Sequence, residues 1–91
     1  MSELNLDVDR ETAKGRYANM AVISHTQNEF LIDFALLQPQ GAAVVVARVL
    51  TSPRHAKAFL RSLAENIRRY EASFGPIEEE GALPPTGWGQ A

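Results

Sequence analysis

Cysteine is absent from this sequence of 91 residues, and histidine occurs only twice. A chain of this length buries only about 60 to 65% of its unfolded surface, so domains this small often depend on disulfides, a metal or a partner subunit. The lack of cysteine excludes disulfides and cysteine–histidine zinc sites, since only His25 and His55 remain to join carboxylates as ligands. We therefore expect no metal or other cofactor, and we expect a partner subunit to complete the fold.

Long apolar runs are missing as well. No stretch of about 18 apolar residues suggests a membrane span, and the first ten residues, MSELNLDVDR, lack the basic and apolar regions of a secretion signal. We expect a cytoplasmic protein without membrane contact. A net charge of -2 and a pI near 5.6 argue against nonspecific nucleic-acid binding by the whole chain, although a local basic face remains compatible with them.

The composition changes once along the chain, after Pro76. The last stretch, IEEEGALPPTGWGQA, has no apolar periodicity and is rich in Glu, Pro and Gly. We expect a single domain over residues 1–76 and a flexible tail over residues 77–91, in which Trp88 is the one anchor-like side chain. The letters LPPTG at 83–87 match a cell-wall sorting pattern, but only WGQA follows, so we reject that interpretation.

Three segments are typical of strands joined by hairpins. Tyr17–His25, Glu29–Leu37 and Ala42–Leu50 are rich in β-branched and aromatic residues, and the turn sequences TQN and QPQG separate them. Near the N-terminus, LNLDVD alternates apolar and polar residues, which suits a further short strand. The pattern predicts an antiparallel meander of three or four strands.

A long helix is predicted after the strands. Ser52 is a good N-cap, Pro53 suits the first helical position, and Gly75 followed by Pro76 ends the helix. Seven apolar residues recur at spacings of three and four: Ala56, Phe59, Leu60, Leu63, Ile67, Tyr70 and Phe74. At about 1.5 Å per residue the helix is about 33 Å long, which matches the strands. We therefore predict an α+β fold in which this C-terminal helix packs along one face of the sheet.

The other face of the sheet then has no cover. If Leu37 and Ala42 flank the QPQG turn, Phe30 lies opposite Val49 and the remaining register follows. We predict that the uncovered face forms a homodimer or larger homo-oligomer through Met20, Val22, Leu31, Asp33, Leu37, Val44, Val46, Arg48 and Leu50.

Two charged residues lie on that predicted interface. In the assumed register Asp33 and Arg48 are diagonal neighbours, close enough for a charge-assisted pair. One interpretation is an acid in a binding site. The other, which we favour, is a pair that fixes the register of an interface.

Other polar residues give weaker signals. His25 ends a strand without a third ligand or a nucleophile pattern nearby, so we interpret it as a hydrogen-bonding histidine rather than a metal ligand or general base. A basic strip, Arg54, Lys57, Arg61 and Arg68, lies on the helix face away from the stripe, with Arg69 nearby and Glu65 interrupting it. Such a strip suits phosphates, but no aromatic residue accompanies it. The chain has no glycine-rich phosphate loop or nucleophile elbow, and we predict no catalytic residue.

An ordered series of residues also resembles a known family. The series is Tyr17-Ala18-Asn19, Ser24-His25, Glu29-Phe30, Asp33-Phe34, Arg48, Ser52-Pro53, His55-Ala56-Lys57, Asn66-Ile67, Tyr70-Glu71 and Phe74-Gly75. It resembles the small bacterial family known as domain of unknown function (DUF) 3467, from LNLDVD to Gly75 and excluding the tail. That resemblance supplies no established activity or cofactor, so it assigns no catalytic residue and leaves the function open. In architecture alone, strands followed by a long helix are more loosely similar to the secretion chaperone SecB.

These observations favour a noncatalytic, homo-oligomeric binding or adaptor protein. It would hold apolar segments in the manner of a chaperone, or serve as a scaffold for another protein. The alternative is a nucleic-acid-associated regulator that uses the basic strip, and an enzyme is the third hypothesis.

Overall fold

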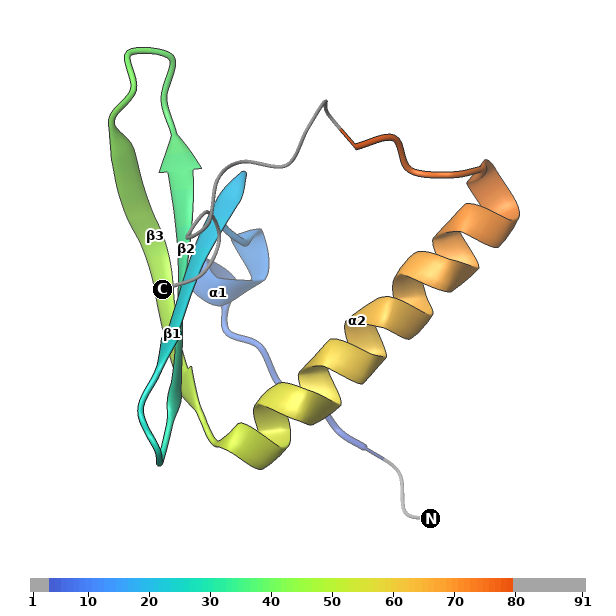
Figure 1. The fold of residues 1–91 in the computed structure, drawn as a ribbon, viewed down its shortest axis with the longest axis horizontal. Helices are drawn as coiled ribbons and strands as arrows, with labels where there is room; N and C mark the ends of the chain where they lie inside the picture. Colours follow the sequence, from blue (N-terminus) through green and yellow to red (C-terminus); the bar gives the residue numbers. More distant parts are fainter. Residues whose placement is uncertain (1–3, 80–91) are drawn as a thin grey trace.

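The computed structural model describes residues 4–79, and it contains one sheet and two helices (Figure 1). Strands β1 (Met20–His25), β2 (Phe30–Leu37) and β3 (Ala43–Thr51) form an antiparallel sheet in the order β1-β2-β3. Helix α2 (Pro53–Phe74) follows β3 directly, and a single helical turn, α1 (Arg10–Lys14), precedes β1. The predicted α+β class, the meander and the long C-terminal helix are confirmed.

The predicted N-terminal strand is not formed, so the sheet of the described residues has three strands. Leu4, Leu6 and Val8 lie in irregular chain and are 76%, 83% and 60% exposed. An alternating pattern becomes a strand only where a neighbouring strand accepts its hydrogen bonds, and no strand does so here. The short helix α1 was not predicted; its five residues are too few for an apolar stripe to mark it.

Polar side chains fix the ends of β1. Before the strand, Asn19 acts as an extra rung of the ladder: its Oδ1 accepts the Leu37 N–H at 2.7 Å and its Nδ2 donates to the Leu37 carbonyl at 3.3 Å. After the strand, the hydroxyl of Thr26 accepts the N–H groups of Asn28 and Glu29, both at 3.2 Å. The TQN turn is therefore closed by its own threonine, as turn chemistry requires.

The register of β2 and β3 differs from the predicted one in two places: the turn places Leu37 opposite Ala43 rather than Ala42, and β3 contains a bulge. Phe34 lies opposite Ala47, but the next residue, Ala35, lies opposite Val45, so Val46 is the extra residue. Phe30 consequently pairs with Thr51 rather than with Val49. Bulges leave no clear trace in a run such as AAVVVARVL, whose small apolar residues suit either face of a sheet.

Alternation along the strands defines two faces, because opposed residues project to the same side. The helix-side face carries Ala21, Ile23, His25, Phe30, Ile32, Phe34, Leu36, Val44, Ala47, Val49 and Thr51. The outer face carries Met20, Val22, Ser24, Leu31, Asp33, Ala35, Leu37, Ala43, Val45, Arg48 and Leu50.

Helix α2 begins and ends at the predicted signals. The Ser52 hydroxyl accepts the His55 N–H at 3.1 Å, and Pro53 occupies the first turn. Gly75 ends the helix with a φ of 93°, a conformation that favours glycine, and its N–H donates to the Glu71 carbonyl at 2.9 Å. Local chemistry therefore sets both ends of the helix.

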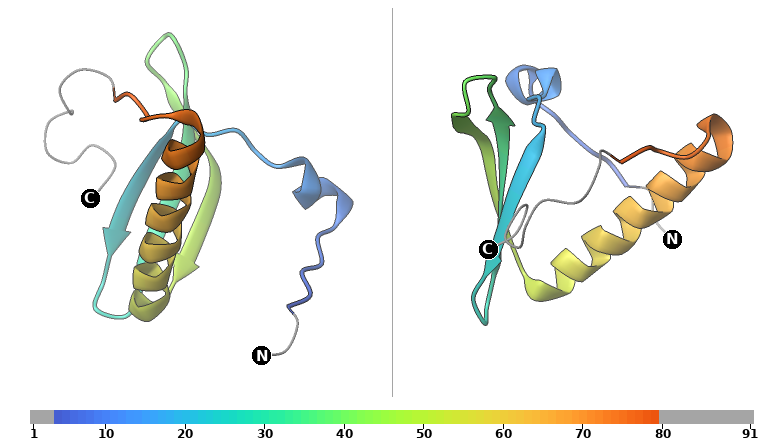
Figure 2. Two further views of the ribbon diagram at one scale, coloured as in Figure 1. Left: turned by 90° about the vertical axis from the view of Figure 1, so that its right-hand side faces the viewer. Right: turned by 45° about the horizontal axis from the view of Figure 1, so that its top comes forward.

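The position of α2 differs from the predicted one. The helix starts beside the lower end of β3 and diverges from the sheet, so that its far end stands well away from every strand (Figures 1 and 2). Past its first turns it makes no extensive contact with a strand. Helix length matched strand length, as expected, but the single residue Ser52 between β3 and α2 points the helix away from the face it was predicted to cover.

The core of the chain is correspondingly small. Among the described residues only Ile32 and Ala35 are buried apolar residues, with exposed fractions of 7% and 3%. The chain exposes 8249 Å², whereas a compact monomer of 10 kDa exposes about 5,200 Å². The fold as a single chain is thus rich in unburied apolar surface.

Candidate functional site

The most distinctive surface is the opening between α2 and the sheet, which we call the wedge. At its narrow end the walls meet around a hollow of about 160 Å³, lined by Ile32, Phe34, Val49, Thr51, His55 and Phe59. This lining is mostly apolar and comes from the helix-side face and the first turns of α2. The predicted stripe therefore faces the predicted side of the sheet but touches it only near this end.

The helix wall of the wedge is the apolar stripe. Its exposed fractions are 42% for Phe59, 62% for Leu60, 46% for Leu63, 40% for Ile67, 50% for Tyr70 and 75% for Phe74. The Tyr70 and Phe74 rings contact each other, with centroids 5.0 Å apart. Large apolar side chains in such a row are normally core residues, and here no other element within residues 4–79 covers the row.

The sheet wall is apolar and open too. Val44 and Val49, toward opposite ends of β3, are 50% and 43% exposed. Val44 was predicted for the interface on the other face, but the turn pairs Leu37 with Ala43 rather than Ala42, which places Val44 on the helix-side face, opposite Leu36. Val45 takes the place on the outer face that the sequence assigned to Val44.

The outer face collects seven of the nine predicted interface residues. Met20, Val22, Leu31, Asp33, Leu37, Arg48 and Leu50 share it, while Val46 lies in the bulge. Val22, Leu37 and Leu50 are more than one-third exposed. The register therefore places a second apolar surface on the side of the sheet away from α2.

Asp33 and Arg48 form the polar centre of the outer face. They are directly opposed rather than diagonal, and the Arg48 guanidinium donates to both carboxylate oxygens, at 2.7 and 2.9 Å. The hydrogen bond from Arg48 lowers the pKa of Asp33, and Asp33 raises the pKa of Arg48. An acid held ionised by two charge-assisted bonds is poorly suited to accept a proton, so the pair suits positioning rather than acid–base chemistry.

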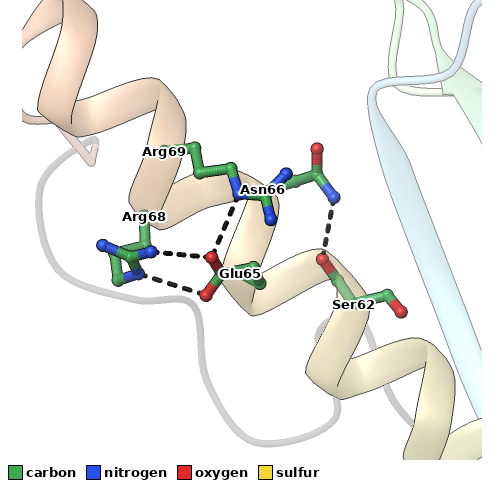
Figure 3. A network of polar contacts seen from close by, with 5 residues as sticks. All are labelled: Ser62, Glu65, Asn66, Arg68 and Arg69. Carbon is green, nitrogen blue, oxygen red and sulfur yellow. Dashed lines mark hydrogen bonds and ion pairs between the residues drawn. The ribbon is translucent and has the colours of Figure 1, made fainter.

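The basic strip is partly neutralised. Glu65 accepts two bonds from Arg68, at 3.1 and 2.7 Å, and one from Arg69 at 3.0 Å (Figure 3). These bonds lower the pKa of Glu65, with Arg68 the larger cause. In the same turn of the helix the Asn66 amide donates to the Ser62 carbonyl at 3.0 Å. Of the predicted strip, Arg54, Lys57 and Arg61 therefore stand apart from this cluster, and Arg68 is part of it.

His25 lies at the end of β1, where its ring stacks on Phe30 with centroids 5.3 Å apart. Within residues 4–79, no group of three His, Cys, Asp or Glu side chains comes together as a metal site would require. No helix of the described chain is long and apolar enough to cross a membrane. Trp88 and the LPPTG segment lie outside the described residues.

Two features of the site were not predicted from the sequence. The hydrogen bonds from the Asn19 side chain to the Leu37 backbone follow no sequence motif other than a polar residue before a strand. One sequence feature could have indicated the wedge. Ser52 alone joins β3 to α2, and so short a connection restricts how the helix can fold back onto the sheet.

The comparisons with known proteins give a family and no activity. Residues 1–79 match the family described as "Protein of unknown function (DUF3467)", which includes every strand and helix above. The chain belongs to the DUF3467 family. Comparisons of this DUF3467 chain with curated proteins and with solved structures found no match.

Proposed function

We propose that this protein is a noncatalytic binding or adaptor protein that works as a homo-oligomer, most simply a dimer, in the cytoplasm. The observation that carries the proposal is the pair of exposed apolar walls of the wedge, together with a core that has only two buried apolar residues among residues 4–79. An adaptor of this kind presents surfaces to another protein and needs no reactive group.

The size of the exposed surface supports self-association. At roughly 150 to 200 Å² for each large apolar side chain, the stripe on α2 leaves on the order of 600 Å² in water. Burying that area is worth on the order of 10 kcal/mol, which is comparable with the whole stability of a small domain. A chain with so small a core therefore gains substantially if association buries this stripe.

The outer face is the second surface available for assembly or for another protein. It combines exposed apolar residues with the Asp33–Arg48 pair, so a partner that packs on it would contact a polar pair of fixed geometry. A paired charge within an apolar interface selects one register over its neighbours.

Light scattering over micromolar concentrations tests the proposal. The wild-type chain is expected to have twice the mass of one chain or more, and Lys57→Asp on the polar side of α2 is expected to keep that mass. A folded, soluble wild-type monomer at all concentrations would defeat the proposal. The outer face is tested separately with Leu50→Asp, which is expected to weaken capture of any partner that packs there.

One observation favours the alternative of nucleic-acid association. Arg54, Lys57 and Arg61 lie along one side of α2, away from the stripe. Against it, Glu65 neutralises part of the strip through Arg68 and Arg69. Salt-dependent retention on DNA or RNA that disappears in Arg61→Glu/Arg68→Glu would favour this function over the adaptor.

A further inference from the structure

We propose that the wedge is filled by the α2 helix of a second copy of this chain, and that the two copies exchange helices. Each α2 seats its apolar stripe on the helix-side face of the other copy. This inference rests on the proposed homo-oligomer and names the contact that forms it.

The junction between β3 and α2 keeps a chain from filling its own wedge. Ser52 is the only residue between the two elements, whereas loops that fold a helix back onto its sheet usually have two to six residues. Pro53 disfavours a helical conformation at Ser52, which is extended with φ of -77° and ψ of 158°. The His55 N–H bond to Ser52 Oγ and the Ala56 N–H bond to the Ser52 carbonyl, at 3.1 and 2.9 Å, fix the first turn. Closing the wedge within one chain would require different backbone dihedral angles at this one-residue junction.

The shape of the sheet wall indicates what fits it. At about 3.3 Å per residue the nine residues of β3 span about 30 Å, and the 22 residues of α2 span about 33 Å at about 1.5 Å per residue. A long amphipathic helix therefore matches the helix-side face in length. The chain itself supplies such a helix, and within residues 4–79 that helix packs extensively on no other element.

The apolar stripe of α2 is wide enough to pack on only one surface. Its residues cover about 100° of the helix, and the opposite side carries charged residues such as Arg61, Glu65 and Arg69. A helix of this kind packs on one apolar surface and turns its other side to water. If two stripes packed on each other, Val44 and Val49 would stay exposed in both copies. Reciprocal exchange covers both stripes and both sheet faces, and it closes with two-fold symmetry.

The area involved suits a stable dimer. Two stripes, each with on the order of 600 Å² exposed, and the two sheet faces that they cover would bury on the order of 2,000 Å² in total. Obligate dimers bury about 2,000 Å² or more, and weak encounters bury less than about 1,200 Å². Helix exchange therefore supplies enough area for a permanent contact.

Cross-linking tests the exchange directly, because the chain has no cysteine of its own. One set of chains carries Val44→Cys or Val49→Cys on the sheet wall. A second set carries Ile67→Cys in the stripe and a larger tag that makes its mass distinct. The two sets are unfolded, refolded together and treated with a short bismaleimide reagent. Val44 and Val49 stand toward opposite ends of the face, so one of them should lie near Ile67 whichever way the helix runs.

The expected result is a covalent species with one tagged and one untagged chain. It should form severalfold more with Ile67→Cys than with the matched variant Arg61→Cys, whose cysteine lies on the charged side of α2. Circular dichroism checks that each variant keeps its helix and sheet. A product that does not depend on which helix position carries the cysteine would overturn the exchange.

Two further results would also overturn it. If chains with both a sheet and a stripe cysteine cross-link internally and stay monomeric in mass, the helix closes on its own sheet. If tagged Ile67→Cys chains link mainly to one another, the stripes pack together. A wild-type dimer without any sheet-to-helix product removes the exchange and leaves the proposed function, whereas a wild-type monomer removes both.

Discussion

Asp33 and Arg48 face each other directly across β2 and β3, and the guanidinium of Arg48 holds both carboxylate oxygens of Asp33, at 2.7 and 2.9 Å. The Asp33 side chain is only 15% exposed, whereas that of Arg48 is 59% exposed. The acid is thus the more buried member of the pair, and the arginine is the more exposed one. Such a bidentate pair has a defined geometry that a lysine at position 48 would not reproduce.

The pair makes stability depend on acid pH. Because the pKa of Asp33 in the folded chain lies below its ordinary value of 3.8, the pair stabilises the fold above that value. The stabilisation is lost as the pH falls through the folded pKa. We expect Asp33→Asn to lower the melting temperature at neutral pH, and we expect its difference from wild type to shrink as the pH falls through the pKa of Asp33 in the folded chain. Glu65 and Asp9, whose pKa values are also lowered, titrate in both proteins and cancel in the comparison. Parallel pH profiles of the two melting temperatures would contradict this role.

Asn19 is expected to hold β1 in register through its two bonds to Leu37. Asn19→Ala removes both bonds and should cost about 1 to 2 kcal/mol. Hydrogen exchange reports it locally, since the Leu37 amide should lose protection in Asn19→Ala but keep it in Asn19→Asp, which retains an acceptor. Gln27→Ala in the turn is the control. Equal protection of Leu37 in wild type and Asn19→Ala would mean that the sheet does not need this rung.

The third prediction concerns the N-cap of α2. Ser52→Ala removes the hydroxyl that accepts the His55 N–H and should lower stability by about 1 kcal/mol, while Ser52→Asp should retain most of it. Thermal unfolding followed by far-UV circular dichroism measures both. Ser62→Ala, an exposed serine within the same helix, is the matched control and is expected to be close to neutral. A loss as large for Ser62→Ala as for Ser52→Ala would contradict the cap.

The sequence was informative where structure depends on local chemistry. Ser52, Pro53 and Gly75 bound α2 because caps act within one turn of a helix. The strands followed from β-branched residues between two turns, and the pairing of Asp33 with Arg48 followed from their shared face.

What the sequence did not predict depends on relations between elements. The pairing of Leu37 with Ala43 rather than Ala42 at the turn moved Val44 to the other face, and a run of alanine and valine gives both registers similar burial. The direction of α2 depends on two dihedral angles at Ser52, and an apolar stripe says only that the helix needs a surface, not which chain supplies it.

The last prediction tests whether the apolar stripe of α2 packs against a second copy of the chain or stays exposed to solvent. Leu63 is 46% exposed in the single chain, so Leu63→Ala would cost little if the chain worked alone. If the stripe is buried against a second copy, the same change should cost about 2 to 5 kcal/mol, as large-to-small core substitutions do. It should also shift dissociation of the dimer to higher protein concentration. Arg61→Ala on the charged side of the same helix is the matched control and should leave the midpoint unchanged. Light scattering and thermal unfolding at several concentrations measure both effects, and equal, small losses at the two positions would show that the stripe contacts nothing in solution.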